Sequence, residues 1–159
     1  MEFEDLDDSA PIISLPGGPV VQLTVFLENR VGALLSIVRM INELRVEVLG
    51  MSMVDSVDVT IVRLIVTDPE AVSARFMERG IPFSESQMVV IELKSGAQSL
   101  AGCLAVLLEV ETNIHFTYPL MSRPDGKSAI AMNVEDPDFS AAALTKAGFR
   151  TLFQEDLSR

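Results

Sequence analysis

The chain has 159 residues, 48% of them hydrophobic, and a formal net charge of −11 at pH 7. The hydrophobic fraction is large enough to fill a core, which excludes extensive disorder. There is no surplus of Lys and Arg to neutralise phosphates, which argues against nucleic acids and anionic membranes as partners. The length fits one domain or two small domains of about 70–80 residues each.

The N-terminus carries much of the negative charge. Five of the first eight residues are acidic, and none of these eight is Lys or Arg. We predict that residues 1–18 form a flexible, solvated tail. The sequence has no apolar run of about 18 residues and no basic-plus-apolar leader, so we expect a cytoplasmic protein without membrane association.

The segment after the tail predicts a strand, a loop, a helix and a hairpin. The strand covers 21–27 and the loop 28–32. Apolar residues at helical spacing predict a helix over 33–45; they are Leu34, Ile37, Val38, Ile41 and Leu44. Strands over 46–54 and 57–67 follow as a hairpin that turns at Asp55-Ser56, and a short strand is predicted around 83–86.

Two further helices are marked by the same three residues in the same order. They are Asp68-Pro69 with Gly80, and Asp136-Pro137 with Gly148, offset by 68 residues. Asp accepts hydrogen bonds from first-turn N–H groups, Pro is tolerated at the first helical position, and Gly can adopt the left-handed conformation that ends a helix. The strands before them also match, at 62–68 and 130–136. The chain therefore contains one unit twice.

The second copy repeats the order of the first. The predicted elements are a strand over 88–94, a loop over 95–98, a helix over 99–111, strands over 114–121 and 127–134, the second Asp-Pro helix and a final strand over 151–154. The turn between its paired strands, 122–126, contains Pro and Gly and makes this hairpin about two residues longer than its counterpart.

Each copy thus has the order β-α-β-β-α-β, which indicates an α+β protein of two ferredoxin-like domains packed side by side. Each domain should form a four-stranded antiparallel sheet with both helices on one face. The first and third strands should be central, and the second and fourth should be edges. We place the first domain at 19–87 and the second at 88–159.

The sequence offers little for catalysis. It contains one Cys and one His, so no cluster has the spacing of a zinc site, and we expect no metal and no cofactor. Cys103 stands in an apolar run and is expected in the core. No phosphate-binding, dinucleotide-binding or nucleophile motif occurs.

The segment from Gln22 to Leu34 (QLTVFLENRVGAL) resembles the opening of an ACT domain. In that family a hydrophobic strand ends at Asp or Asn, a short loop carries a Gly, and a helix begins. The whole chain resembles a tandem ACT-domain protein without a catalytic partner domain, similar to the aspartokinase regulatory region and acetolactate synthase small subunits. The resemblance covers residues 20–158 and implies binding of an amino acid or a similar small ligand.

This resemblance implies a ligand site at the first loop, formed by Asn29, Arg30, Val31, Gly32, Ala33 and Leu34. A helix start suits an α-carboxylate, and Gly32 allows close approach to the backbone. Asn29 either caps the helix or accepts from an ammonium group, and Arg30 is either a carboxylate clamp or simply exposed.

The opposite wall is expected from a neighbouring edge strand or from a second chain. Its candidates within the chain are Ile114, His115, Phe116 and Tyr118. Tyr118 and His115 differ in strand parity, so they should lie on opposite faces. In the second copy Gln98 aligns with Gly32, and Gly96 could serve only if the loop shifts, so we expect one competent site, on the first loop.

The leading hypothesis is therefore an amino-acid-binding regulatory or sensor protein that acts on another enzyme or regulator, and we expect a homodimer. The alternative is an interaction or oligomerisation module with a degenerate ligand site, because open edge strands favour pairing. An acylphosphatase-like enzyme is the least favoured hypothesis, because no glycine-rich phosphate loop surrounds Asn29-Arg30.

Overall fold

We analysed a computed structural model, which describes residues 18–28 and 32–158. The predicted tail lies outside the described residues except for Gly18. The first repeat contains β1 (Val20–Glu28), α1 (Ala33–Glu43), β2 (Val48–Asp55), β3 (Val59–Val66) and α2 (Pro69–Glu78). The second contains α3 (Ala97–Glu109), β5 (Ile114–Pro119), a 3₁₀ turn η1 (Pro124–Gly126), β6 (Ser128–Val134), α4 (Pro137–Lys146), β7 (Thr151–Leu152) and α5 (Gln154–Leu157).

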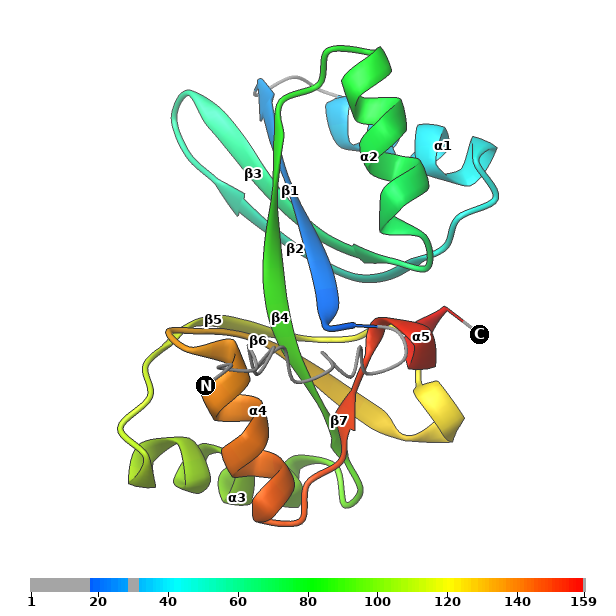
Figure 1. The fold of residues 1–159 in the computed structure, drawn as a ribbon. Coiled ribbons are helices and arrows are strands. Elements are labelled where there is room, and N and C mark those ends of the chain that lie inside the picture. The colour runs from blue at the N-terminus through cyan, green and yellow to red at the C-terminus, as the bar shows by residue number, and fades with distance from the viewer. Residues whose placement is uncertain (1–17, 29–31, 159) are drawn as a thin grey trace, which may run out of the picture.

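The two repeats share the strand β4 (Phe83–Leu93), which runs through both halves of the molecule (Figure 1). All strand pairs are antiparallel, and the order is β2-β3-β1-β4-β6-β5, with β7 also pairing with β4. The predicted α+β fold is confirmed. The first and third strands of each repeat are central, as predicted: β1 and β3 in the first, β4 and β6 in the second.

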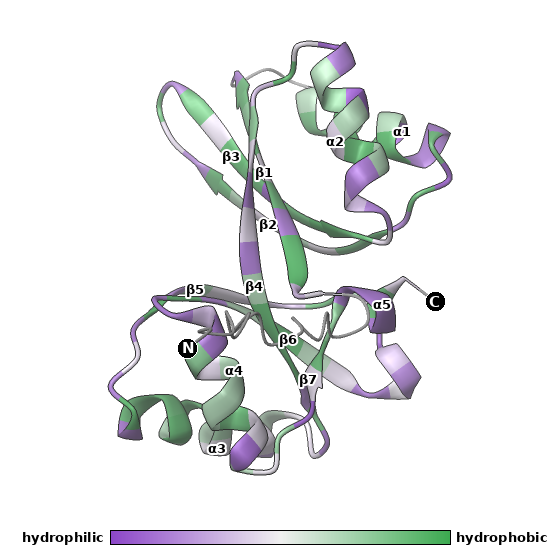
Figure 2. Ribbon diagram, viewed as in Figure 1, coloured by the Kyte–Doolittle hydropathy of each residue, from purple (hydrophilic) through white to green (hydrophobic). Residues whose placement is uncertain are grey.

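The sequence predicted two strands where the structure has β4 alone. The first part of β4, Phe83 to Met88, pairs with β1, and the remainder, Val89 to Leu93, pairs with β6. Figure 2 shows that β4 is hydrophilic just before it enters the second sheet. It continues as a strand because β1 supplies partners for its backbone N–H and C=O groups.

Three apolar clusters form the core. One lies between α1, α2 and the first sheet, and includes Ile41 and Phe76. Another lies between α3, α4 and the second sheet, and includes the predicted core residue Cys103. The third joins the repeats through the sheet faces that carry no helices, and includes Ile65 and Tyr118. Helices α1 to α4 therefore lie on the outer sides of the molecule (Figure 1).

The Asp-Pro helices form as the sequence predicts. The Asp68 carboxylate accepts a hydrogen bond from the Ala71 N–H at 3.1 Å, and Asp136 accepts one from the Phe139 N–H at 3.1 Å. Gly80 follows α2 with φ +65°, and Gly148 follows α4 with φ +96°.

The short helix α5 was not predicted from the sequence. It packs onto the first repeat, where the Gln154 amide donates to the Val66 carbonyl at 3.0 Å and the Ser158 hydroxyl donates to the Thr67 carbonyl at 2.6 Å. The C-terminus thus connects the two repeats. In the part of the chain that the structure describes, no helix is long and apolar enough to cross a membrane.

Candidate functional site

The candidate site lies where β1 ends and α1 begins. Gly32 is the N-cap of α1 and has φ +87°, a left-handed conformation that favours glycine. Glycine has no side chain to accept hydrogen bonds from the first turn, and that turn, Ala33 to Ser36, contains no acid. The N-terminus of α1 therefore keeps the partial positive charge that Asp neutralises at α2 and α4.

A pocket of about 160 Å³ lies beside this helix start. Its apolar lining comes from Leu27, Ala33, Leu34 and Met53, and its polar lining from Glu28, Asp55 and Thr60. The volume corresponds to several waters at about 30 Å³ each. The pocket thus joins an uncapped helix terminus, two carboxylates and an apolar wall in one place.

The polar wall is held by the hairpin of β2 and β3. The Thr60 hydroxyl donates to Asp55 Oδ1 at 3.0 Å, which orients the carboxylate. Thr60 pairs with Leu27 across β1 and β3, so the hairpin turn lies beside the end of β1. Sequence reasoning missed these residues. The β-α-β-β order could have indicated them, because it places the start of the third strand next to the end of the first.

The structure describes only part of the ligand site predicted at the first loop. Gly32, Ala33 and Leu34 lie at the start of α1, and two of them line the pocket. Asn29, Arg30 and Val31 lie outside the described residues, so their predicted contacts stay predictions.

The predicted opposite wall lies elsewhere in the chain. Tyr118 is buried, and its hydroxyl donates to Gln22 Oε1 at 2.7 Å. Gln22 stands six residues before Glu28 on β1, about 20 Å away along an extended strand. The structure therefore does not bring β5 and the first loop together within one chain. A wall from a second chain stays a prediction.

Two of these β5 residues, Phe116 and Tyr118, lie at the junction between the repeats. Phe116 lies beneath the Arg63 guanidinium, 3.7 Å from the ring centroid, and its ring is parallel to that of Tyr118. Ile114 packs in the core of the second repeat. His115 is exposed whereas Tyr118 is buried, as their strand parity predicted.

The second loop is shifted by two residues, the case in which the sequence predicted that Gly96 could serve. Gly96, not Gln98, is the N-cap of α3, with φ +60°, and so corresponds to Gly32. The cause is helix length: α3 has 13 residues and α1 has 11. This difference hides the correspondence when the copies are aligned backwards from the next strand.

Glu92 stands four residues before the N-cap glycine of α3, as Glu28 stands four residues before that of α1, but it is used differently. Its side chain is only 1% exposed, and it accepts from the Arg150 guanidinium at 2.8 Å. Lys127 Nζ lies 3.5 Å from the other carboxylate oxygen. Hydrogen bonds from Arg150 to Asp125 and Glu92 raise the pKa of the guanidinium. This carboxylate is committed to ion pairs within the fold.

The described residues contain no group of three or more His, Cys, Asp or Glu that could hold a metal ion. The chain matches the family model described as an ACT domain pair over residues 19–150. The chain belongs to this family.

Solved ACT-like structures share the fold of this ACT domain pair. Protein BT0572 from Bacteroides thetaiotaomicron superposes with a TM-score of 0.81 at 20% identity, covering 90% of this chain and 98% of its own. The ligand-free regulatory subunit of aspartate kinase from Thermus thermophilus gives 0.55 at 12% identity, covering 85% and 96%. The corresponding subunit from Thermus flavus gives 0.50 at 14% identity, covering 81% and 92%. No curated protein matches the chain.

Proposed function

We propose that this ACT domain pair is a regulatory module that binds a free amino acid in the pocket at the end of β1. One observation carries the proposal: the pocket presents the three kinds of group that an amino acid requires. The uncapped start of α1 suits the α-carboxylate, the carboxylates of Glu28 and Asp55 suit the ammonium group, and Leu27, Leu34 and Met53 suit an apolar side chain.

Membership of the ACT domain pair family supports a regulatory role rather than a catalytic one. Bound ligand would contact both α1 and the β2–β3 hairpin, so it would favour conformations in which these elements are close. The regulated partner is an enzyme or another regulator in solution. Arg30, which lies outside the described residues, remains the predicted clamp for the ligand carboxylate.

The proposal is tested by thermal unfolding of the purified chain with each of the twenty amino acids. We expect one amino acid, or a few of similar side chain, to raise the melting temperature, because a ligand at 100 times its Kd stabilises by about 2.7 kcal/mol. Asp55→Asn should weaken binding by about tenfold, because the ammonium group loses its charged acceptor.

Asp58→Asn is the matched control, because Asp58 lies in the same hairpin turn but does not line the pocket. This variant should bind like the parent. A flat response to all twenty amino acids would contradict the proposal, and equal losses in both variants would assign the effect to overall charge rather than to the pocket.

A flat response would favour the second candidate, an interaction module. The observation behind it is the edge strand β2, which exposes Met51, Met53 and Val54 beside the fully accessible turn at Val57. An edge of this kind is a template for pairing with another strand.

A further inference from the structure

The outer face of α3 is apolar, unlike that of the corresponding helix in the first repeat. Ala101, Leu104, Ala105 and Leu108 recur at i, i+3, i+4 and i+7, which places them on one stripe. All four are exposed, Leu104 at 40% and Leu108 at 79%. The opposite side of the helix, with Cys103 and Leu107, is already buried in the core of the second repeat. The stripe therefore has no role in packing this helix onto its sheet.

Helix α1 shows what the fold alone requires. It occupies the same place in the first repeat and buries Ile37, Met40 and Ile41. Its outer face carries the exposed polar residues Ser36, Arg39 and Asn42, and its exposed large apolar side chain is Leu35 alone. In Figure 2 most of α3 is green, whereas α1 is mixed. A helix that is apolar all round is normally covered, so the stripe of α3 indicates an interface.

We propose that a second copy of this chain covers the stripe, with the two α3 helices packed antiparallel about a two-fold axis between Leu104 and Ala105. A two-fold interface must be complementary to itself. In this register Ala101 lies opposite the partner's Leu108, and Leu104 lies opposite the partner's Ala105. Each large side chain thus meets a small one, which lets the helices approach closely.

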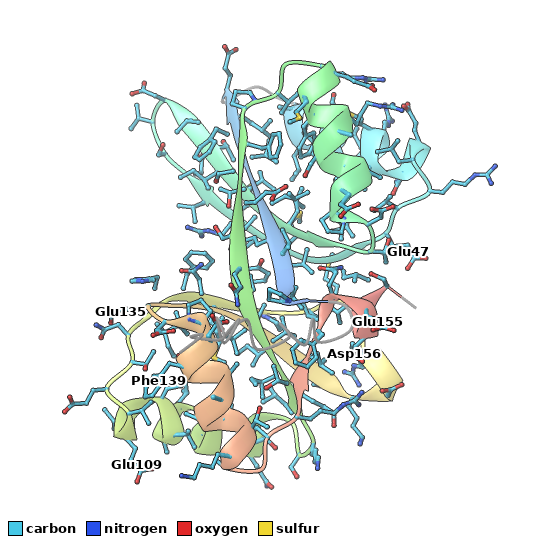
Figure 3. The ribbon with its side chains drawn as sticks, in the orientation of Figure 1. Glu47, Glu109, Glu135, Phe139, Glu155 and Asp156 are labelled. Carbon is cyan, nitrogen blue, oxygen red and sulfur yellow. The ribbon has the colours of Figure 1, made fainter. Side chains whose placement is uncertain are left out.

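The charges at the two ends of α3 fit the same arrangement. The C-terminal end carries the exposed acids Glu109 and Glu111, which are unfavourable beside the negative end of their own helix dipole. Figure 3 shows Glu109 at the outer edge of α3. The N-terminal end has Gly96 as N-cap, no acid in its first turn, and the exposed Lys94 just before it. Antiparallel packing brings each acidic end beside the partner's uncapped, Lys94-bearing end.

Sedimentation equilibrium of the full chain, without added ligand, tests the proposal. The parent should be a dimer, and Leu108→Glu should weaken dimerisation by about tenfold or more, because it buries a carboxylate in an apolar contact. Leu35→Glu is the matched control: Leu35 is 51% exposed on α1, and this variant should associate like the parent. Circular dichroism of each variant checks that the fold is kept.

A charge pair tests the register. Ala101→Lys and Leu108→Glu should each weaken the dimer, and the double variant should recover it, because position 101 then faces position 108 of the partner with opposite charge. A monomeric parent would overturn the proposal. So would a dimer that Leu108→Glu leaves intact while Met53→Lys on β2 disrupts it. A double variant no better than the single ones would overturn the antiparallel register.

Discussion

The ends of the two first strands differ although the repeats share one fold. In the first repeat Glu28 is exposed and lines the pocket beside α1. In the second, Glu92 near the end of β4 is buried and bound by Arg150 and Lys127. Both helices begin at a glycine with positive φ, but ψ is −5° at Gly32 and −131° at Gly96, so the two loop backbones differ as well. The comparison teaches that two loops on one fold can place an acidic side chain either at an exposed pocket edge or in a buried ion-pair network.

The largest change in stability is expected when Arg150, the ion-pair partner of Glu92, is removed. We expect Arg150→Met to lower the free energy of unfolding by about 2–3 kcal/mol, because Glu92 would stay buried with only Lys127 as an ion-pair partner. Urea unfolding followed by circular dichroism measures the change.

Two further variants isolate the buried charge. Arg150→Met with Glu92→Leu should recover most of the loss, because the apolar pair leaves no buried carboxylate. Arg75→Met breaks the exposed pair with Glu78, which joins the two side chains at 3.3 Å, and should cost less than about 1 kcal/mol. A double variant as unstable as the single one would show that Glu92 is not the source of the effect.

The two hairpins, β2–β3 and β5–β6, also differ. The edge strand β5 is anchored to the first repeat through Tyr118, whereas the edge strand β2 exposes Met53 and Val54. Tyr118→Phe should lower the free energy of unfolding by about 1–2 kcal/mol, because the buried Gln22 Oε1 loses its donor. The same urea titration measures it, and His115→Phe, at an exposed position on β5, should change much less.

Alkaline pH gives a second readout of Tyr118. Burial raises the pKa of its phenol, against a smaller lowering by Arg63. Above about pH 10 the unfolded phenol loses its proton first, so the unfolded state binds fewer protons and the free energy of unfolding falls as pH rises. The parent should lose stability faster than Tyr118→Phe in this range. Tyr118 is the only tyrosine, so tyrosinate absorbance should rise together with unfolding.

The smallest expected effect concerns the two Asp-Pro helices, where the repeats should behave alike. Asp68→Ala and Asp136→Ala should each lower the free energy of unfolding by about 1 kcal/mol, because the first turn loses its acceptor. The Asn variants keep an acceptor at the same position and should lie close to the parent. A large difference between the two Ala variants would contradict equal capping in the two repeats.

Local chemistry made most of the fold predictable. The Asp-Pro helices depend on three residues whose roles are set within one turn of helix, and their capping bonds form as expected. The apolar periodicity of α1 and the strands depends only on which face meets a core. These signals need no knowledge of distant parts of the chain.

The features that the sequence did not predict depend on distant partners. The strands predicted around 83–86 and over 88–94 are one strand because β1 pairs with it up to Met88 and β6 pairs with the rest, and α5 is held by the Val66 and Thr67 carbonyls of the first repeat. Tyr118 was assigned to a ligand wall, but its partner is Gln22 on another strand. For the candidate site, the start of α1 was predictable from the glycine, whereas Asp55 and Thr60 enter it through strand pairing.

The shared strand β4 has a consequence for the way the protein opens. If one repeat unfolded alone, the half of β4 that it pairs with would expose its backbone groups, and the other half would lose the support of a continuous strand. Local opening in one repeat therefore loosens the other at the same place. We expect the amide hydrogens of both sheets to exchange with solvent through one common opening. The two repeats should therefore unfold as one cooperative unit.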